Sequence, residues 1–268
     1  MIDTHFHLIR PAHSAAYQNK RKLSIDREWE RCGIVGGIAV QPSMYRFDNS
    51  HLLSILNRFP EKLRGVAVVP QDVKIAQLED LKRLGIIGLR LNMIDNPEQR
   101  SVPGPDFFKK TRDANLFLQV HAKGIQLANV IDASIRYETS LVVDHIGKPD
   151  SSLGTDQSGF REMIGGAQEG SVMIKLSAPF RIADKDAQFE TASCFARCAL
   201  DQAPLDRFLL GTDWPFLNCA KQPSMDCIQV WFKKLLPRNS DFTKVAFDNA
   251  SRLSGLIPNS RSPDIGNS

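Results

Sequence analysis

The stretch "IDTHFHL", residues 2–8, places His5 and His7 two positions apart, with apolar residues between and around them. Side chains two apart on a β-strand point to the same face of a sheet. We therefore expect a strand at this end of the chain, with both imidazoles directed toward one place.

Seven further strand-like runs follow, separated by segments of helical period. Strands that alternate with helices predict right-handed crossovers and a parallel sheet. The runs are "VGGIAVQP" (35–42), "LRGVAVV" (63–69), "IIGLRLNM" (86–93), "LFLQVHAK" (116–123), "SLVVDHIG" (140–147), "SVMIKLSA" (171–178) and "FLLGTDWP" (208–215). Helices are expected near 48–59, 74–84, 104–114, 125–136, 156–169, 186–203, 222–236 and 242–255.

Eight such units predict an α/β fold, a closed (β/α)₈ TIM-like barrel. An open doubly wound sheet is the alternative, but such a sheet usually carries a glycine-rich phosphate turn after its first strand, and no GxGxxG follows this one. We expect one barrel domain over residues 1–257. The last residues, 258–268, are polar and rich in Pro, Gly and Ser, which predicts a disordered tail.

Composition narrows the class of protein. With 42% hydrophobic and 24% charged residues and a net charge of +4, the 268-residue chain has a globular balance. No apolar run approaches the roughly 20 residues of a membrane span, and no nucleic-acid-reading motif accompanies the short basic segments. The five cysteines form no CxxC pair, which fits the reducing cytoplasm. We expect a cytoplasmic protein; the sequence leaves its oligomeric state open, with a homodimer as one option.

Polar residues gather near the C-terminal ends of several predicted strands, where (β/α)₈ barrels carry their active sites. Burying so many titratable groups together is costly unless they bind something or share protons. Imidazole nitrogens and a carboxylate oxygen form a ligand set that suits zinc, iron or manganese. The residues concerned are His5, His7, His121, His145 and Asp213.

Cations near the same ends predict a small anionic substrate, because guanidinium groups pair well with carboxylates. Arg90 is the strongest of these candidates, since it shares a strand face with Asn92 and an inward arginine is rare without a partner. Lys148 and Arg181 follow the sixth and seventh strands. Lys175 is expected to point inward, as part of a structural ion pair or as a substrate contact.

Four segments together resemble the amidohydrolase superfamily: "IDTHFHL", "VVDHIGKP", "LLGTDWP" and "AFDNASRLSGL". The branch they resemble is the amidohydrolase-2 group, which includes the 2-pyrone-4,6-dicarboxylate lactonases and related decarboxylases. The resemblance extends from Met1 to about Ile257 and implies a TIM-like barrel with its chemistry at the strand ends.

The resemblance also implies roles for individual residues. His5 and His7 match the pair on the first strand that binds a metal or the substrate carbonyl, and His121 matches a histidine that completes a mononuclear metal site. His145 matches the histidine that orients the substrate or polarises its carbonyl. Asp213 matches the aspartate that activates the attacking water.

The predicted metal set is thus His5, His7, His121 and Asp213, holding one divalent ion such as zinc or manganese. A binuclear site is not expected, because Arg90 stands where such members carry a bridging lysine. Metal-independent lactonases of the group keep much of the same set, so activity without a metal stays open.

The predicted function is a hydrolase that opens a carboxylated lactone, with Asp213 as general base and His145 as its catalytic partner. Arg90, Lys148 and Arg181 are the predicted substrate contacts. Two alternatives remain: a metal-dependent non-oxidative decarboxylase of the same superfamily, and a barrel that binds an anionic ligand without turnover.

Overall fold

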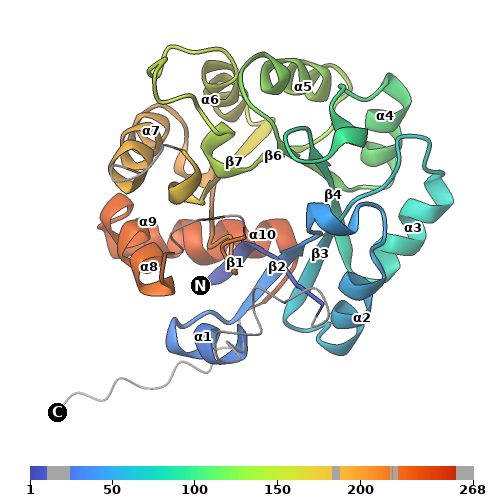
Figure 1. Cartoon of the computed structure of the whole chain (residues 1–268), viewed down its shortest axis with the longest axis horizontal. Coiled ribbons are helices and arrows are strands. Elements are labelled where there is room, and N and C mark those ends of the chain that lie inside the picture. Colours follow the sequence, from blue (N-terminus) through green and yellow to red (C-terminus); the bar gives the residue numbers. More distant parts are fainter. Residues whose placement is uncertain (11–24, 183–187, 218, 220–222, 258–268) are drawn as a thin grey trace.

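The computed structural model describes residues 1–10, 25–182, 188–217, 219 and 223–257. In this part of the chain, eight parallel strands lie in sequence order around the centre of the molecule (Figure 1), which confirms the predicted barrel. The strands are β1 (Ile2–Phe6), β2 (Gly36–Val40), β3 (Leu63–Ala67), β4 (Ile86–Asn92), β5 (Phe117–His121), β6 (Leu141–Val143), β7 (Val172–Ser177) and β8 (Phe208–Gly211).

The barrel closes between β8 and β1, at their C-terminal ends. Phe6 and Trp214 form a parallel bridge. The amide of Asp213 donates to the carbonyl of His5, and the amide of His7 donates to the carbonyl of Trp214. Both distances are 2.8 Å. This seam sets Asp213, two residues beyond β8, beside the two histidines of the first strand.

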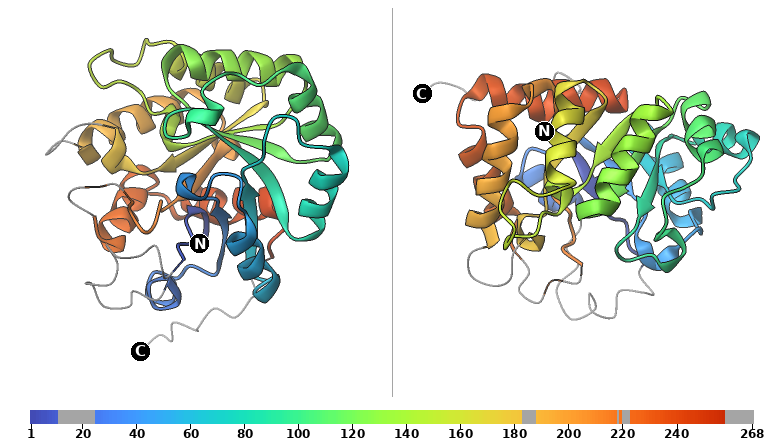
Figure 2. Two further views of the ribbon diagram at one scale, coloured as in Figure 1. Left: turned by 45° about the vertical axis from the view of Figure 1, so that its right-hand side comes forward. Right: turned by 90° about the horizontal axis from the view of Figure 1, so that it is seen from above.

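Helices surround the strands on the outside (Figures 1 and 2). Each of the eight predicted helical regions contains a helix. The region 242–255 contains the end of α9, a π-helical turn (Lys244–Asp248) and α10, and α1 was not predicted. The bounds are α1 (Ile25–Arg31), α2 (Ser50–Arg58), α3 (Ile75–Arg83), α4 (Pro105–Asp113), α5 (Gly124–Arg136), α6 (Phe160–Gln168), α7 (Gln188–Gln202), α8 (Met225–Leu235), α9 (Asn239–Thr243) and α10 (Asn249–Ser254).

Local signals explain several helix ends. α4 begins with Pro105 in its first turn, where the missing amide hydrogen costs nothing. At the start of α8, the hydroxyl of Ser224 accepts from the amide of Cys227. α10 ends at Gly255, whose φ of 68° is the left-handed conformation that glycine adopts easily.

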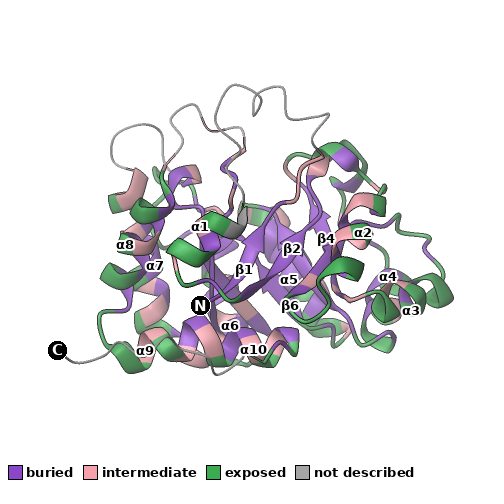
Figure 3. Cartoon of the chain, turned by 90° about the horizontal axis from the view of Figure 1, so that it is seen from below, coloured by how far each residue is buried: buried purple, intermediate pink, exposed green. Residues whose placement is uncertain are grey.

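Buried residues concentrate in the strands, while the outer helices carry the exposed ones (Figure 3). The larger apolar core lies between strands and helices; Phe6, for example, packs edge-on against Trp29. A smaller cluster joins residues of the strands to α10 and the segment after it. It consists of Ile2, Ile38, Val40, Val66, Phe117, Val142, Leu209, Ala250 and Leu256. By strand parity, Phe117 and Leu209 share a face with the polar residues that follow them, so this cluster forms an apolar floor beneath the polar layer.

The sixth strand is shorter than predicted. Instead of running over 140–147, β6 ends at Val143, and the chain turns through a 3₁₀ segment, η4 (His145–Gly147). His145, Ile146, Gly147 and Lys148 all have positive φ, between 43° and 72°. A β-branched residue such as Ile146 is strained in that region. The turn brings the Nδ1 atom of His145 to 2.8 Å from the hydroxyl of Ser177.

Two further expectations concern membrane-spanning helices and the C-terminal tail. Among the described helices, none combines the length and apolar character needed to cross a membrane. The tail predicted at 258–268 lies outside the described residues.

Candidate active site

Four histidines line up inside the barrel near the C-terminal ends of the strands. The ring centroids of His5 and His7 are 5.1 Å apart, and those of His5 and His145 are 4.7 Å apart. The ring of His121 follows at 5.0 Å from that of His145. All four are buried, so the predicted shared face of His5 and His7 is confirmed.

Asp213 lies against the first two of these rings. Its Oδ1 atom is 3.3 Å from His7 Nε2 and 3.6 Å from His5 Nε2, and its Oδ2 atom accepts a 2.6 Å hydrogen bond from Arg181 Nε. Burial alone would raise the pKa of Asp213, but Arg181 and then His145 hold it well below its usual value. Asp213 is therefore an ionised carboxylate at neutral pH.

Three ligand atoms converge at this point: His5 Nε2, His7 Nε2 and Asp213 Oδ1, all within 4.8 Å of one another. His5 Nε2 and Asp213 Oδ1 are buried and have no hydrogen-bond partner among the described residues. Unpartnered buried acceptors facing one another are unfavourable unless a cation lies between them. The residues present thus fit one divalent metal ion.

His121 stands apart from this group. Its Nδ1 atom is 3.2 Å from Asn92 Oδ1, and its buried Nε2 atom has no hydrogen-bond partner. Among the described residues, the metal-type groupings that contain His5 and Asp213 do not include His121. The structure therefore brings together three of the four residues predicted as metal ligands, with His121 two rings beyond His5 in the row, past His145.

A second grouping, His5, Asp144 and His145, also has metal-ligand spacing. However, the ammonium of Lys175 lies 3.5 Å from both Asp144 Oδ1 and His5 Nδ1. A second cation at this place would be repelled by Lys175. Only the grouping with Asp213 is open to a metal.

Burial keeps His5, His121 and His145 neutral. It lowers the pKa of His5 to about 4 and that of His121 to about 3, and it lowers the pKa of His145 well below its usual value. Neutral imidazoles can bind a metal or accept a hydrogen bond through one nitrogen. For His7, the contact of Nδ1 with the carbonyl of Val40 at 2.8 Å requires a hydrogen on Nδ1, so Nε2 is the nitrogen available to a metal.

The predicted cations lie at different depths. Arg90 Nη1 and Asn92 Nδ2 both reach the hydroxyl of Ser43, at 3.5 and 2.5 Å, which confirms their shared face. Arg90 donates through Nη1 to the carbonyl of Gln41 at 2.9 Å, while its buried Nε has no hydrogen-bond partner. Lys148 is half-buried, and burial lowers its pKa. Arg181, with 20% of its side chain exposed, supports Asp213 directly.

Sequence reasoning missed two supporting carboxylates. Asp144 contacts His5 Nδ1 at 3.1 Å. Asp3 accepts from the amide and hydroxyl of Thr212 and from the amide of His5, and burial raises its pKa to about 6. Asp3 stands two residues before His5, but the pairing of β1 with β2 is irregular between Asp3 and Phe6, so strand parity does not place its side chain. Asp144 directly precedes His145, and nothing local in the sequence indicates its partner.

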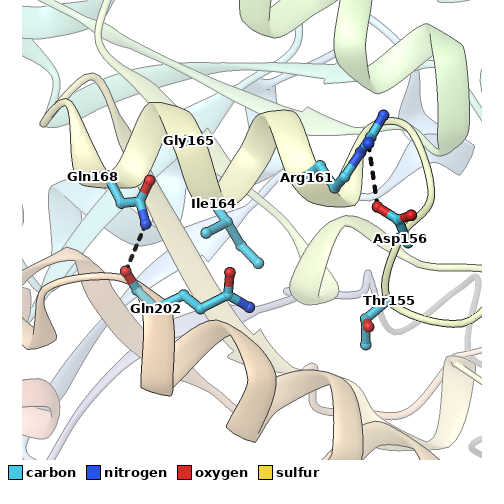
Figure 4. Close-up of a pocket in the computed structure, with 7 residues that line it drawn as sticks. All are labelled: Thr155, Asp156, Arg161, Ile164, Gly165, Gln168 and Gln202. Carbon is cyan, nitrogen blue, oxygen red and sulfur yellow. Dashed lines mark hydrogen bonds and ion pairs between the residues drawn. The ribbon is translucent and has the colours of Figure 1, made fainter.

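A groove between α6 and α7 lies outside this cluster (Figure 4). Gln168 Nε2 donates to the carbonyl of Gln202 at 2.9 Å at one end, and Arg161 pairs with Asp156 at 3.2 Å at the other. These polar groups satisfy one another. None of the residues that line the groove belongs to the histidine cluster.

Comparison with known proteins supplies independent findings. The family model described as Amidohydrolase matches residues 2–256. The chain is 26% identical over 271 residues to a 4-sulfomuconolactone hydrolase of Rhizobium radiobacter, covering 95% of this chain and 90% of that one. It is also 26% identical over 279 residues to a 2-pyrone-4,6-dicarboxylate hydrolase of Comamonas testosteroni, covering 94% and 89%.

Among solved structures, the fold matches a probable 2-pyrone-4,6-dicarboxylic acid hydrolase of Acinetobacter baumannii, determined with citric acid bound. The TM-score is 0.83 at 21% sequence identity, over 95% of this chain and 98% of the other. At that identity the match shows a common barrel architecture.

Proposed function

The chain belongs to the amidohydrolase family, and from this premise we propose that it is a hydrolase that opens an anionic lactone. The relatives from Rhizobium radiobacter and Comamonas testosteroni are both named as hydrolases of such rings. The observation that carries the proposal is the open set formed by His5 Nε2, His7 Nε2 and Asp213 Oδ1. This set is what water activation beside an ester carbonyl requires.

The amidohydrolase superfamily is often metal-dependent, and the three atoms suit zinc or manganese. A divalent metal held by His5, His7 and Asp213 would lower the pKa of a bound water and polarise the ester carbonyl. We propose His121 as a further contact to the metal or the substrate, because its Nε2 has no hydrogen-bond partner in the described part of the chain.

The chain's own residues then carry the proton. Asp213, ionised and buried, accepts the proton of the attacking water at Oδ1 and returns it to the ring oxygen when the acyl C–O bond breaks. His145, held at Nδ1 by Ser177, orients the carbonyl through its other nitrogen. Arg181 keeps the Asp213 carboxylate in place during this transfer.

Cations around the cluster suit the negative groups of the substrate. Arg90 has an unpartnered Nε, and Lys148 lies half-buried beyond His145. With Arg181 they form the proposed contacts to a carboxylate or sulfonate group. A small anionic lactone therefore satisfies both the catalytic set and the charges beside it.

The alternatives are less favoured. The relatives compared above are named as hydrolases, and neither name describes a decarboxylase. A barrel that only binds an anionic ligand would gain nothing from the ionised Asp213 in this set, because the carboxylate repels an anion.

We further propose that residues 1–257 form one catalytic domain that works in the cytoplasm. The family model extends over 2–256, almost the whole of that range. Cys32, Cys194, Cys198 and Cys227 are thiols outside any disulfide, which fits a reducing compartment.

The test is turnover of 4-sulfomuconolactone and 2-pyrone-4,6-dicarboxylate by the zinc-loaded protein, followed by loss of lactone absorbance and by acid release. Asp213→Asn should lower kcat by about 10²–10⁴-fold, since it removes the general base. Asp156→Asn, a matched change at an exposed ion pair, should leave kcat unchanged. Normal turnover by Asp213→Asn, or release of carbon dioxide in place of acid, would contradict the proposal.

A further inference from the structure

A closed polar network lies on the opposite side of His5 from Asp213. It consists of Lys175 on β7, Gln119 on β5 and Asp144 just beyond β6. Lys175 Nζ is 2.7 Å from Gln119 Oε1 and 3.5 Å from Asp144 Oδ1, and Gln119 Nε2 is 3.0 Å from Asp144 Oδ2. All three side chains are fully or almost fully buried.

The direction of each hydrogen bond follows from the chemistry of the groups. A lysine ammonium only donates, so it fixes the Gln119 oxygen toward itself and the amide nitrogen toward Asp144. A carboxylate only accepts, so Asp144 Oδ2 receives that amide hydrogen. Asp144 Oδ1, 3.1 Å from His5 Nδ1, must likewise accept a hydrogen from the imidazole.

Two carboxylates therefore compete for the one ring hydrogen of neutral His5. Asp144 approaches Nδ1 to 3.1 Å, whereas Asp213 approaches Nε2 only to 3.6 Å and makes no hydrogen bond there. The shorter contact places the hydrogen on Nδ1. The lone pair on Nε2 is then directed at the set that contains Asp213.

Stability alone does not account for this network. Buried ion pairs can often be replaced by apolar residues of similar volume without loss of stability. The contact of the network with one ring nitrogen of His5 gives it a different use, because a partner on one nitrogen decides which nitrogen can bind a metal.

We propose that Lys175, Gln119 and Asp144 act as one positioning unit that holds His5 in its Nδ1–H tautomer and presents Nε2 to a divalent cation shared with His7 and Asp213. The part that concerns the cation rests on the metal site of the proposed function. Lys175 acts two contacts away from the metal, by fixing the amide of Gln119 and balancing the charge of Asp144.

The experiment observes the tautomer in metal-free, full-length protein labelled with [¹⁵N]histidine. Long-range ¹H–¹⁵N correlation distinguishes protonated from unprotonated ring nitrogens, and the signal of His5 is assigned by its loss in His5→Gln. In wild type we expect Nδ1–H. In Asp144→Asn the competition is lost, and we expect the hydrogen to move to Nε2, where Asp213 accepts it.

Zinc affinity, measured in competition with a chromophoric chelator, provides the second readout. Asp144→Asn should weaken zinc binding by about 10–100-fold, as removal of such a supporting partner does elsewhere. Asp95→Asn is the matched control: it removes the same charge 3.6 Å from a different ring, that of His121, and should leave the His5 tautomer unchanged. Lys175→Met should weaken zinc binding about tenfold and replaces Asp144→Asn if that variant does not fold.

An Nε2–H tautomer in wild type would overturn the proposal. So would retention of Nδ1–H and wild-type zinc affinity in Asp144→Asn or Lys175→Met. Absence of zinc binding in wild type would remove the role of the unit toward a cation. By contrast, zinc binding with the expected tautomers but without lactone turnover would contradict only the proposed function.

Discussion

Two buried carboxylates flank His5, and they differ in how well their oxygens are satisfied. On one side, Asp144 Oδ2 accepts a hydrogen bond from Gln119, and Asp144 Oδ1 accepts one from His5 and forms an ion pair with Lys175. On the other side, Asp213 Oδ2 accepts a hydrogen bond from Arg181, while Asp213 Oδ1 has no hydrogen-bond partner in the described part of the chain. One histidine thus separates a completed network from an incomplete one.

This difference distinguishes a network that positions His5 from a set of atoms that binds a ligand. Unsatisfied buried polar groups are rare in folded proteins and concentrate where a ligand completes them. The network around Asp144 is complete without any ligand, so its task is to hold His5. The set around Asp213 is left open, so it is the place where metal and substrate meet.

The largest predicted effect contrasts the two carboxylates in metal-free protein. Asp144→Asn should lower the free energy of unfolding by about 3–5 kcal/mol, because it leaves the buried ammonium of Lys175 without its counter-charge. Asp213→Asn should lower it less, by about 1.5–3 kcal/mol, because it weakens one charged hydrogen bond, that of Arg181, which is 20% exposed to water. Urea unfolding measures both.

The double variant Asp144→Asn/Lys175→Met serves as the control for this comparison. It removes both charges, so its loss of stability should be clearly smaller than the sum of the two single losses. Equal losses for Asp144→Asn and Asp213→Asn would show that both carboxylates are equally structural, and the contrast drawn above would be wrong.

The sequence could predict what depends on local spacing. His5 with His7, and Arg90 with Asn92, were placed on common strand faces because the side-chain period of a strand is two. The order of strands and helices predicted the barrel for the same reason, since each element shows its own period.

The remaining features depend on contacts between distant residues. His5 and Asp144 are 139 residues apart in the chain, and no local pattern links them. The strand predicted at 140–147 was too long because His145 and Ile146 adopt positive φ without being glycine, a conformation that tertiary contacts impose. His121 was assigned to the metal set by resemblance to the family, because the position of a residue at a strand end does not tell which of the neighbouring rings it will contact.

An intermediate effect tests the seam that carries Asp213. A Cβ atom at Gly211 would lie 2.6 Å from His5 Cβ and 3.1 Å from His5 N, so Gly211→Ala should cost about 1–3 kcal/mol of unfolding free energy and lower kcat by displacing His5. Gly165→Ala is the control: its Cβ would meet nothing within 4 Å on α6, and alanine should stabilise that helix by about 0.5–1 kcal/mol. Equal unfolding free energies and kcat values for the two variants would mean that the seam between β8 and β1 accommodates a methyl group at position 211.

The smallest effect is acid sensitivity contributed by His121, the ring beyond His145 in the row of four. Burial lowers the pKa of His121 to about 3, so unfolded chains bind a proton near pH 6.5 that the folded protein does not. Lowering the pH from 7 to 5.5 should therefore cost about 1 kcal/mol through this residue. Urea unfolding at both pH values should show a smaller loss of unfolding free energy for His121→Gln than for wild type. Subtracting the two losses cancels the contributions of other titrating groups, including Asp3, whose raised pKa acts in the opposite direction. Identical losses would mean that His121 is protonated in the folded protein, and this end of the row of rings would then carry a positive charge.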